Sequence, residues 1–173
     1  SISIQSTTGF INILDAKGNM KALIPKVKRY DRTMGKPDRV EYTLTPLNWD
    51  KSKYPDLRWR VVGEGWSNAP AIASDGTLWK FQNPPRARGT RYGSVELGSK
   101  LPIVNRMSSE TDWIQASSGS NYALALRRDG TIWGWGNNRF GQLGVVFEED
   151  QKWTHELIQV GYDNDWVSIG ASW

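Results

Sequence analysis

The sequence predicts an all-β protein made of β-propeller-like blades, each a four-stranded antiparallel sheet, in an incomplete propeller or a segment of one. Three observations predict it: one stretch recurs at near-constant spacing, each copy holds an Asp-Gly step between strand-like runs, and tryptophans return in register. Repeats of about 40–50 residues with these features are typical of propeller blades. Ten tryptophans in 173 residues also supply the large apolar side chains that disordered chains lack.

The repeat is visible when two segments are aligned without a gap. "LRWRVVGEGWSNAPAIASDGTLWKF" begins at Leu57, and "TDWIQASSGSNYALALRRDGTIWGW" begins 54 residues later at Thr111. A third copy opens with "DNDWVSIGASW", which contains Trp166. We expect the recurring tryptophans to pack between neighbouring units. The positions that recur are Trp59, Trp113 and Trp166, then Asp75-Gly76 and Asp129-Gly130, then Trp79 and Trp133.

Each copy has the pattern of antiparallel strands. In the second copy, Asp129-Gly130 separates the strand-like runs "YALALR" and "TIWGW". An Asp-Gly pair in this position favours a hairpin, because glycine accepts the positive φ of a tight turn. A single hairpin cannot bury both of its faces, so neighbouring units are expected to cover them.

The copies divide the chain. Residues 57–110 and 111–164 are predicted to be blade repeats, with 111–144 the better match, and 165–173 to be the first strand of a further repeat. Residues 1–56 are a leading β-element or a degenerate earlier repeat, since "GFINILDAKGNMKALI" has the pattern of two short strands around a turn. At about 54 residues per unit, the chain holds roughly three blades. We therefore expect it to be a fragment of a longer polypeptide, or further copies or partner chains to complete the ring.

The segment "DWIQASSGSNYALALRRDGTIWGWGNNRFGQLG" resembles one repeat of the regulator-of-chromosome-condensation family, whose repeats close into a seven-bladed β-propeller. The resemblance rests on the opening Trp113, on "ALAL", on "DGTIW" and on the terminal "WGNNRFGQLG". The copy at 57–81 matches over its first half and then departs from the pattern. We expect tight backbone turns at Gly136 and Gly141, because glycine accepts the backbone conformations that such turns need. The terminal positions for which we expect structural roles are Trp135, Gly136, Asn138, Gly141, Leu143 and Gly144.

The sequence offers no pattern for catalysis. It has no cysteine, and His155 is its only histidine, so thiol nucleophiles and sites built from several cysteines or histidines are excluded. Gly134-Trp135-Gly136 lacks the third glycine of a dinucleotide loop, because position 139 is Arg139. We predict no catalytic, metal or cofactor-binding residues. The leading interpretation is a non-enzymatic protein-interaction module whose loops meet a protein partner, or a component of a larger assembly such as a virion.

Two groups of residues are candidates for partner binding. Arg86, Arg88 and Arg91 lie in the loop-like stretch "NPPRARGTRYG", and their guanidinium groups would suit a phosphate or carboxylate. Trp49 and Trp153 fall outside the register of the repeat, and they suggest a carbohydrate-binding propeller as an alternative.

Charge gives a weaker alternative, which is nucleic-acid or chromatin binding through the first third of the chain. Residues 1–60 hold 12 Lys and Arg against 6 Asp and Glu, and the remainder holds 10 against 12. No run approaches the roughly 20 apolar residues of a membrane span, and the N-terminal residues lack a signal-peptide pattern. The sequence thus predicts a soluble protein and gives no indication of its compartment.

Overall fold

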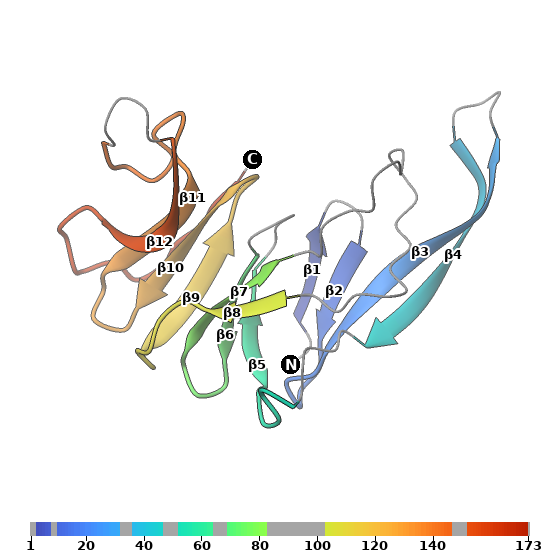
Figure 1. Ribbon diagram of the computed structural model, residues 1–173, viewed down its shortest axis with the longest axis horizontal. Coiled ribbons are helices and arrows are strands. Elements are labelled where there is room, and N and C mark those ends of the chain that lie inside the picture. Colours follow the sequence, from blue (N-terminus) through green and yellow to red (C-terminus); the bar gives the residue numbers. More distant parts are fainter. Residues whose placement is uncertain are drawn as a thin grey trace.

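The computed structural model describes residues 3–7, 10–31, 36–46, 52–63, 69–82, 103–146 and 152–172. All regular elements in these ranges are β-strands, and they form three four-stranded antiparallel sheets that lie side by side in an arc (Figure 1). In each sheet the strands pair in sequence order. The predicted all-β class with four-stranded antiparallel sheets is therefore confirmed. Within the described ranges, no helix has the length and apolar character that crossing a membrane requires.

The first sheet contains the turn that the N-terminal sequence indicates. The Asp15 carboxylate accepts hydrogen bonds from the backbone N–H groups of Lys17, at 2.9 Å, and Asn19, at 3.0 Å. Gly18 follows with a φ of +77°. This turn joins the second and third strands of the sheet, whose four strands are β1 (Ser3–Thr7), β2 (Phe10–Leu14), β3 (Met20–Asp31) and β4 (Lys36–Pro46).

The second and third sheets each have an Asp-Gly hairpin between their two central strands. The residues that flank the turns pair as Ile72 with Leu78 and as Leu126 with Ile132. The second sheet consists of β5 (Trp59–Val62), β6 (Ala69–Ala73), β7 (Leu78–Gln82) and β8 (Ile103–Arg106). The third consists of β9 (Trp113–Ser118), β10 (Tyr122–Arg127), β11 (Ile132–Asn137) and β12 (Trp153–Val160).

Two hydrophobic cores lie between neighbouring sheets. The first joins Leu14 and Met20 of the first sheet to Trp59, Trp79 and Phe81 of the second. The Trp59 and Trp79 rings meet edge to face, with centroids 6.0 Å apart, which is a favourable geometry for aromatic pairs. Trp59 is 2% exposed, so this tryptophan packs between two units.

The second core joins the middle sheet to the third. Ile72 and Leu78 of the middle sheet pack with Trp113, Ala123 and Trp135 of the third. Full burial of a side chain such as Leu78 stabilises the fold by about 1.5–3 kcal/mol. The middle sheet thus has a core on each face, which explains why all five residues of β6 are buried.

A backbone hydrogen bond recurs where one unit follows another. The N–H of Trp59 donates to the carbonyl of Gly18 at 3.1 Å, and the N–H of Trp113 donates to that of Gly76 at 3.3 Å. The third instance joins Trp166 to Gly130, also at 3.3 Å. Each hairpin glycine therefore contacts the tryptophan that opens the next unit.

Trp166 differs from the other two opening tryptophans in its burial. It is 45% exposed, whereas Trp113 is 2% exposed. Residues 161–172 contain no strand, although the Gln115 side chain exchanges two hydrogen bonds with the backbone of Ile169, at 2.9 and 3.1 Å. No sheet among the described residues covers Trp166, so recurrence in register does not by itself bury this side chain.

Candidate interaction surfaces

The recurring Asp-Gly-Thr-x-Trp positions form a hydrogen-bonded turn. In the second sheet, Asp75 accepts from the Thr77 backbone N–H at 3.0 Å and from its hydroxyl at 2.6 Å. The Trp79 indole N–H donates to the same hydroxyl oxygen at 2.7 Å. The third sheet repeats this arrangement. Asp129 accepts from the Thr131 backbone N–H at 3.0 Å and from its hydroxyl at 2.7 Å, and the Trp133 indole N–H donates to that hydroxyl oxygen at 3.0 Å. These side chains fix the turn and orient a tryptophan toward the core.

The carboxylates of these turns have lowered pKa values. The Thr131 hydroxyl and backbone N–H hold the pKa of Asp129 below its ordinary value. At Asp75, burial raises the pKa, but the hydrogen bonds from Thr77 outweigh burial and the net direction is downward. Both groups therefore stay ionised as acceptors at neutral pH.

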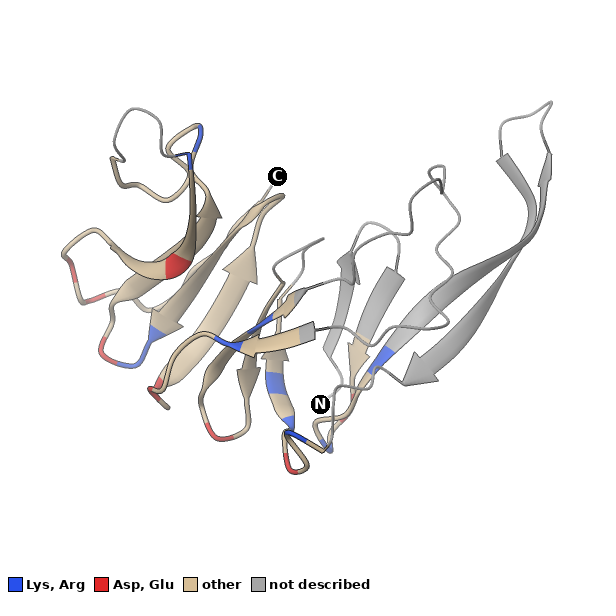
Figure 2. Ribbon diagram, viewed as in Figure 1, with Lys and Arg blue, Asp and Glu red and all other residues tan. Residues whose placement is uncertain are grey.

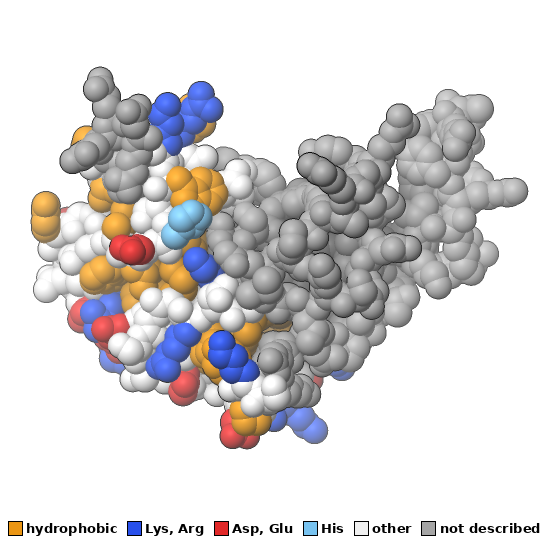
Figure 3. All heavy atoms as spheres, in the orientation of Figure 1, with side chains coloured by type: hydrophobic (Ala, Val, Ile, Leu, Met, Phe, Trp, Pro, Cys, Tyr) orange, Lys and Arg blue, Asp and Glu red, His pale blue; other side chains and the backbone are white. Residues whose placement is uncertain are grey.

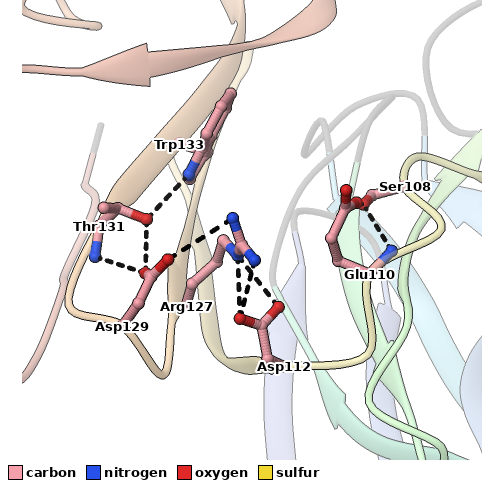
Figure 4. Close-up of polar contacts among 7 residues, drawn as sticks. All are labelled: Ser108, Glu110, Asp112, Arg127, Asp129, Thr131 and Trp133. Atoms are coloured by element: carbon pink, nitrogen blue, oxygen red, sulfur yellow. Dashed lines mark hydrogen bonds and ion pairs between the residues drawn. The ribbon is translucent and has the colours of Figure 1, made fainter.

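A charged cluster fastens the segment before β9 to the third sheet (Figure 4). The Arg127 Nε donates to both carboxylate oxygens of Asp112, at 3.0 and 3.1 Å, and a second nitrogen lies 2.9 Å from Asp112 Oδ2. The Arg127 guanidinium also lies 3.5 Å from Asp129 and 5.8 Å from the Trp113 ring centroid. The hydrogen bond with Asp112 raises the pKa of Arg127. Because the charges satisfy one another, we assign this cluster a structural role.

The glycine-rich stretch after β11 is an ordered loop, residues 138–146. The Asn138 side chain donates to the Val145 carbonyl at 2.7 Å and accepts from the Leu143 backbone N–H at 2.8 Å. Leu143 is fully buried and anchors the loop in the sheet. Gly136, just before the loop, has a φ of +106°, and a Cβ there would lie 2.4 Å from the Asn121 carbonyl oxygen. The terminal part of the motif thus builds a fixed loop.

The tip of this loop projects into solvent. Phe140 is 81% exposed, and the Arg139 guanidinium lies 5.8 Å from its ring centroid. The Phe140 backbone N–H donates to the Gln142 side chain at 2.9 Å, and the Arg139 N–H donates to Asn137 at 2.7 Å. We call Arg139 and Phe140 the loop tip. It combines an exposed aromatic ring and a cation on a fixed backbone.

Of the predicted partner-binding residues, the structure places Trp153. It begins β12, is half-buried, and donates from its indole N–H to His155 Nδ1 at 3.2 Å. The two rings lie 5.9 Å apart, and the histidine side chain, pale blue in Figure 3, lies at the surface beside hydrophobic side chains. Trp49, Arg86, Arg88 and Arg91 lie outside the described residues. No group of three or more potential metal ligands occurs in the ranges that the structure describes.

Sequence comparison identifies the unit that carries the loop. Residues 113–142 match the model of the Regulator of chromosome condensation (RCC1) repeat. The predicted resemblance is therefore confirmed for the copy with the most complete motif.

Curated relatives match parts of the chain at modest identity. The Ultraviolet-B receptor UVR8 of Arabidopsis thaliana is 28% identical over 119 residues, which are 65% of this chain and 25% of that protein. The X-linked retinitis pigmentosa GTPase regulator homolog of Caenorhabditis elegans is 29% identical over 92 residues, 51% of this chain and 6% of that protein. The chain thus spans a quarter or less of the length of these relatives.

Solved structures share the fold over most of the chain. Prp20p from Saccharomyces cerevisiae aligns with a TM-score of 0.59 and 13% identity, covering 92% of this chain and 38% of that one. Human WBSCR16 aligns with a TM-score of 0.56 and 14% identity, and the alignment covers 92% of this chain and 37% of that one. At these identities the likeness concerns the fold, and it confirms that the three sheets are arranged as in RCC1 β-propellers.

The sequence predictions did not include the loop tip. They gave "WGNNRFGQLG" structural roles only, whereas in the structure Leu143 is buried and Phe140 is exposed. A bulky aromatic residue between turn-forming Asn and Gly residues was the available signal, because such a position rarely faces a core.

Proposed function

We propose that this chain is a non-enzymatic protein-interaction module whose propeller blades hold an exposed loop tip against a protein partner. Proteins with the same fold support this class of function: Prp20p is described with its binding properties to Gsp1p and histones, and yeast RCC1 has been solved bound to Kap60. For this chain we propose a protein as the class of partner and the loop tip as the surface that contacts it.

The exposure of Phe140 on an anchored loop is the observation that carries this proposal. Aromatic and arginine side chains dominate the binding energy of protein interfaces, and both are present in the loop tip. Because Asn138 and the buried Leu143 already order the loop, binding would lose little conformational entropy. Phe140 would lose its exposed apolar surface to a pocket on the partner.

Substitution of Phe140 tests the proposal directly. The full chain is used to capture interacting proteins, the captured candidates are purified, and binding is measured by calorimetry with the chain and with Phe140→Ala. We expect the substitution to weaken binding at least about tenfold, as loss of an interface anchor does. Tyr162→Ala is the matched control, because Tyr162 is an equally accessible aromatic residue, 99% exposed, outside the loop.

Two outcomes would contradict the proposed function. One is that Phe140→Ala binds the purified partner with an unchanged affinity while its circular dichroism matches that of the parent chain. The other is that no captured protein binds the purified chain.

We also infer how the chain is divided and completed. The boundaries 57–110 and 111–164 for two blade repeats agree with sheets of four strands each, and the turn at Asp15 and Gly18 favours an earlier, degenerate repeat in residues 1–56. The exposure of Trp166 and Val167 favours a further blade over this side of the third sheet, supplied by more of the polypeptide or by another chain.

A further inference from the structure

A shallow groove lies between the outer parts of the second and third sheets, and we call it the rim groove. Its volume is about 470 Å³. Figure 2 shows basic segments on the middle sheet, including one on β8, and an acidic segment on β12 of the neighbouring sheet. The residues that matter here are Lys80, Arg106 and Met107 on one side and His155, Glu156 and Leu157 on the other.

Lys80 is the unusual member of the rim groove. It follows Leu78 by two residues on β7, so its side chain leaves the same face as Leu78, toward the second core. The side chain is half-buried, and burial lowers the pKa of its ammonium group. Within the described ranges, the ammonium group has neither a hydrogen bond nor an ion pair, although Glu156 lines the same groove. The residues that the structure describes thus give this partly desolvated cation no ion-pair partner.

Two other side chains of the groove, Arg106 and His155, offer hydrogen-bond donors. The Trp153 indole can only donate, so its contact with His155 Nδ1 leaves the proton of a neutral imidazole on Nε2. Arg106 uses its Nε and one Nη for the carbonyls of Ser108 and Ser109, at 2.9 and 3.3 Å, and keeps further N–H groups. The charge of Arg106 also acts on Asp75 and Glu110, and it helps to lower their pKa values. Among the residues that line the groove, Glu156 is the single carboxylate, set against the N–H donors of Lys80, Arg106 and His155.

We propose that the rim groove binds a carboxylate side chain from an acidic segment of the protein partner. Lys80 supplies the counter-charge, Arg106 and His155 supply N–H donors, and Met107 and Leu157 contact the apolar part of that side chain. This inference rests on the proposed protein-binding function, and it adds the chemical class of the bound segment.

A carboxylate fits this site better than a nucleic-acid backbone. Nucleic-acid binding requires several basic residues along one track, because each phosphate carries a charge. Residues 61–173 hold 10 Lys and Arg against 12 Asp and Glu, and Glu156 would repel a phosphate within the groove. A ligand with one or two carboxylates needs only a few positive groups close together, and Lys80 and Arg106 provide them in the groove.

Titration with a hexaglutamate peptide tests this proposal by NMR on the isotope-labelled full chain. We expect saturable shifts of the Lys80 side-chain and His155 ring signals with a millimolar dissociation constant, on the order of that for a single ion-paired contact. The pKa of Lys80 should rise when the peptide binds, because an anion favours the charged ammonium. Lys80→Met keeps the apolar stem and removes the charge, and it should weaken binding at least about tenfold. Lys152→Met, an exposed lysine outside the groove, should leave binding unchanged.

Several outcomes would overturn the proposal. These are the absence of saturable shifts, equal affinities of Lys80→Met and the parent chain, or shifts with inorganic phosphate or oligodeoxythymidylate at concentrations where hexaglutamate gives none. If the amide spectrum of Lys80→Met shows loss of the fold, Arg106→Gln provides the same comparison. Because the titration uses no partner, a chain that binds hexaglutamate but captures no protein contradicts the proposed function alone. If the chain binds its partner through Phe140 but does not bind hexaglutamate, the result contradicts only the proposal for the rim groove.

Discussion

Gly76 shows how one residue serves both a turn and the junction to the next unit. Its φ is +85°, and a Cβ at this position would lie 1.8 Å from the carbonyl oxygen of Thr111. Its own carbonyl accepts the hydrogen bond from Trp113. A side chain here would therefore both strain the backbone and separate two sheets.

Comparing Gly76→Ala with Gly141→Ala separates these two effects. Gly141 has a similar φ of +78°, but nothing lies within 4 Å of its added Cβ. We expect Gly141→Ala to lower the free energy of unfolding by about 1–2 kcal/mol, the cost of a left-handed backbone with a side chain. Gly76→Ala should lower it by more than about 3 kcal/mol, because the clash with Thr111 is added.

Urea unfolding followed by tryptophan fluorescence measures both losses. Since the two variants share the backbone strain, the difference between them reports the contact between units. Equal losses for the two variants would show that this contact contributes nothing.

At the scale of elements, local patterns predicted the strands and hairpins well. Asp-Gly turns and alternating runs depend on a few adjacent residues, and the hairpins at Asp75 and Asp129 form where the sequence places them. The sequence could not show the loop tip, because the exposure of Phe140 depends on how Asn138 and Leu143 fold the loop. It could not show the rim groove either, because Lys80 and its neighbours on β12 are distant in sequence.

Asn138 gives a prediction for the loop as an element. Asn138→Ala leaves the Val145 carbonyl and the buried Leu143 backbone N–H without their partner, so we expect a loss of about 1–3 kcal/mol in the stability of the loop. Hydrogen exchange should accelerate at Leu143 but not at Ala125 in β10. Gln142→Ala removes the exposed hydrogen bond from the Phe140 backbone N–H, and it should change hydrogen exchange at Leu143 little. Unchanged exchange at Leu143 in Asn138→Ala would mean that other contacts order the loop.

At the scale of the whole molecule, the three sheets differ in how they are covered. The middle sheet has a core on each face, whereas the third has the exposed Trp166 and Val167 beyond its last strand. The sequence predicted that tryptophans in register pack between units, and this holds for Trp59 and Trp113. It could not predict the exposure of Trp166, because burial of a repeat residue requires the next unit to be present.

We expect this exposed side to drive association of the 173-residue chain in solution. Unpaired apolar surface at the end of a sheet array favours pairing with another copy. Native mass spectrometry should detect species heavier than the 19.6 kDa chain, and Val167→Glu should reduce them. A well-folded, monodisperse monomer of 19.6 kDa at all concentrations would contradict the proposal that another blade or chain covers this side.

The hydrogen bonds from Trp59, Trp113 and Trp166 to the preceding hairpin glycines use main-chain atoms only. Each joint requires a glycine at the hairpin but depends little on the identity of the surrounding side chains, so most other residues can differ while successive units keep their spacing. This accounts for a shared architecture at 13% identity with Prp20p.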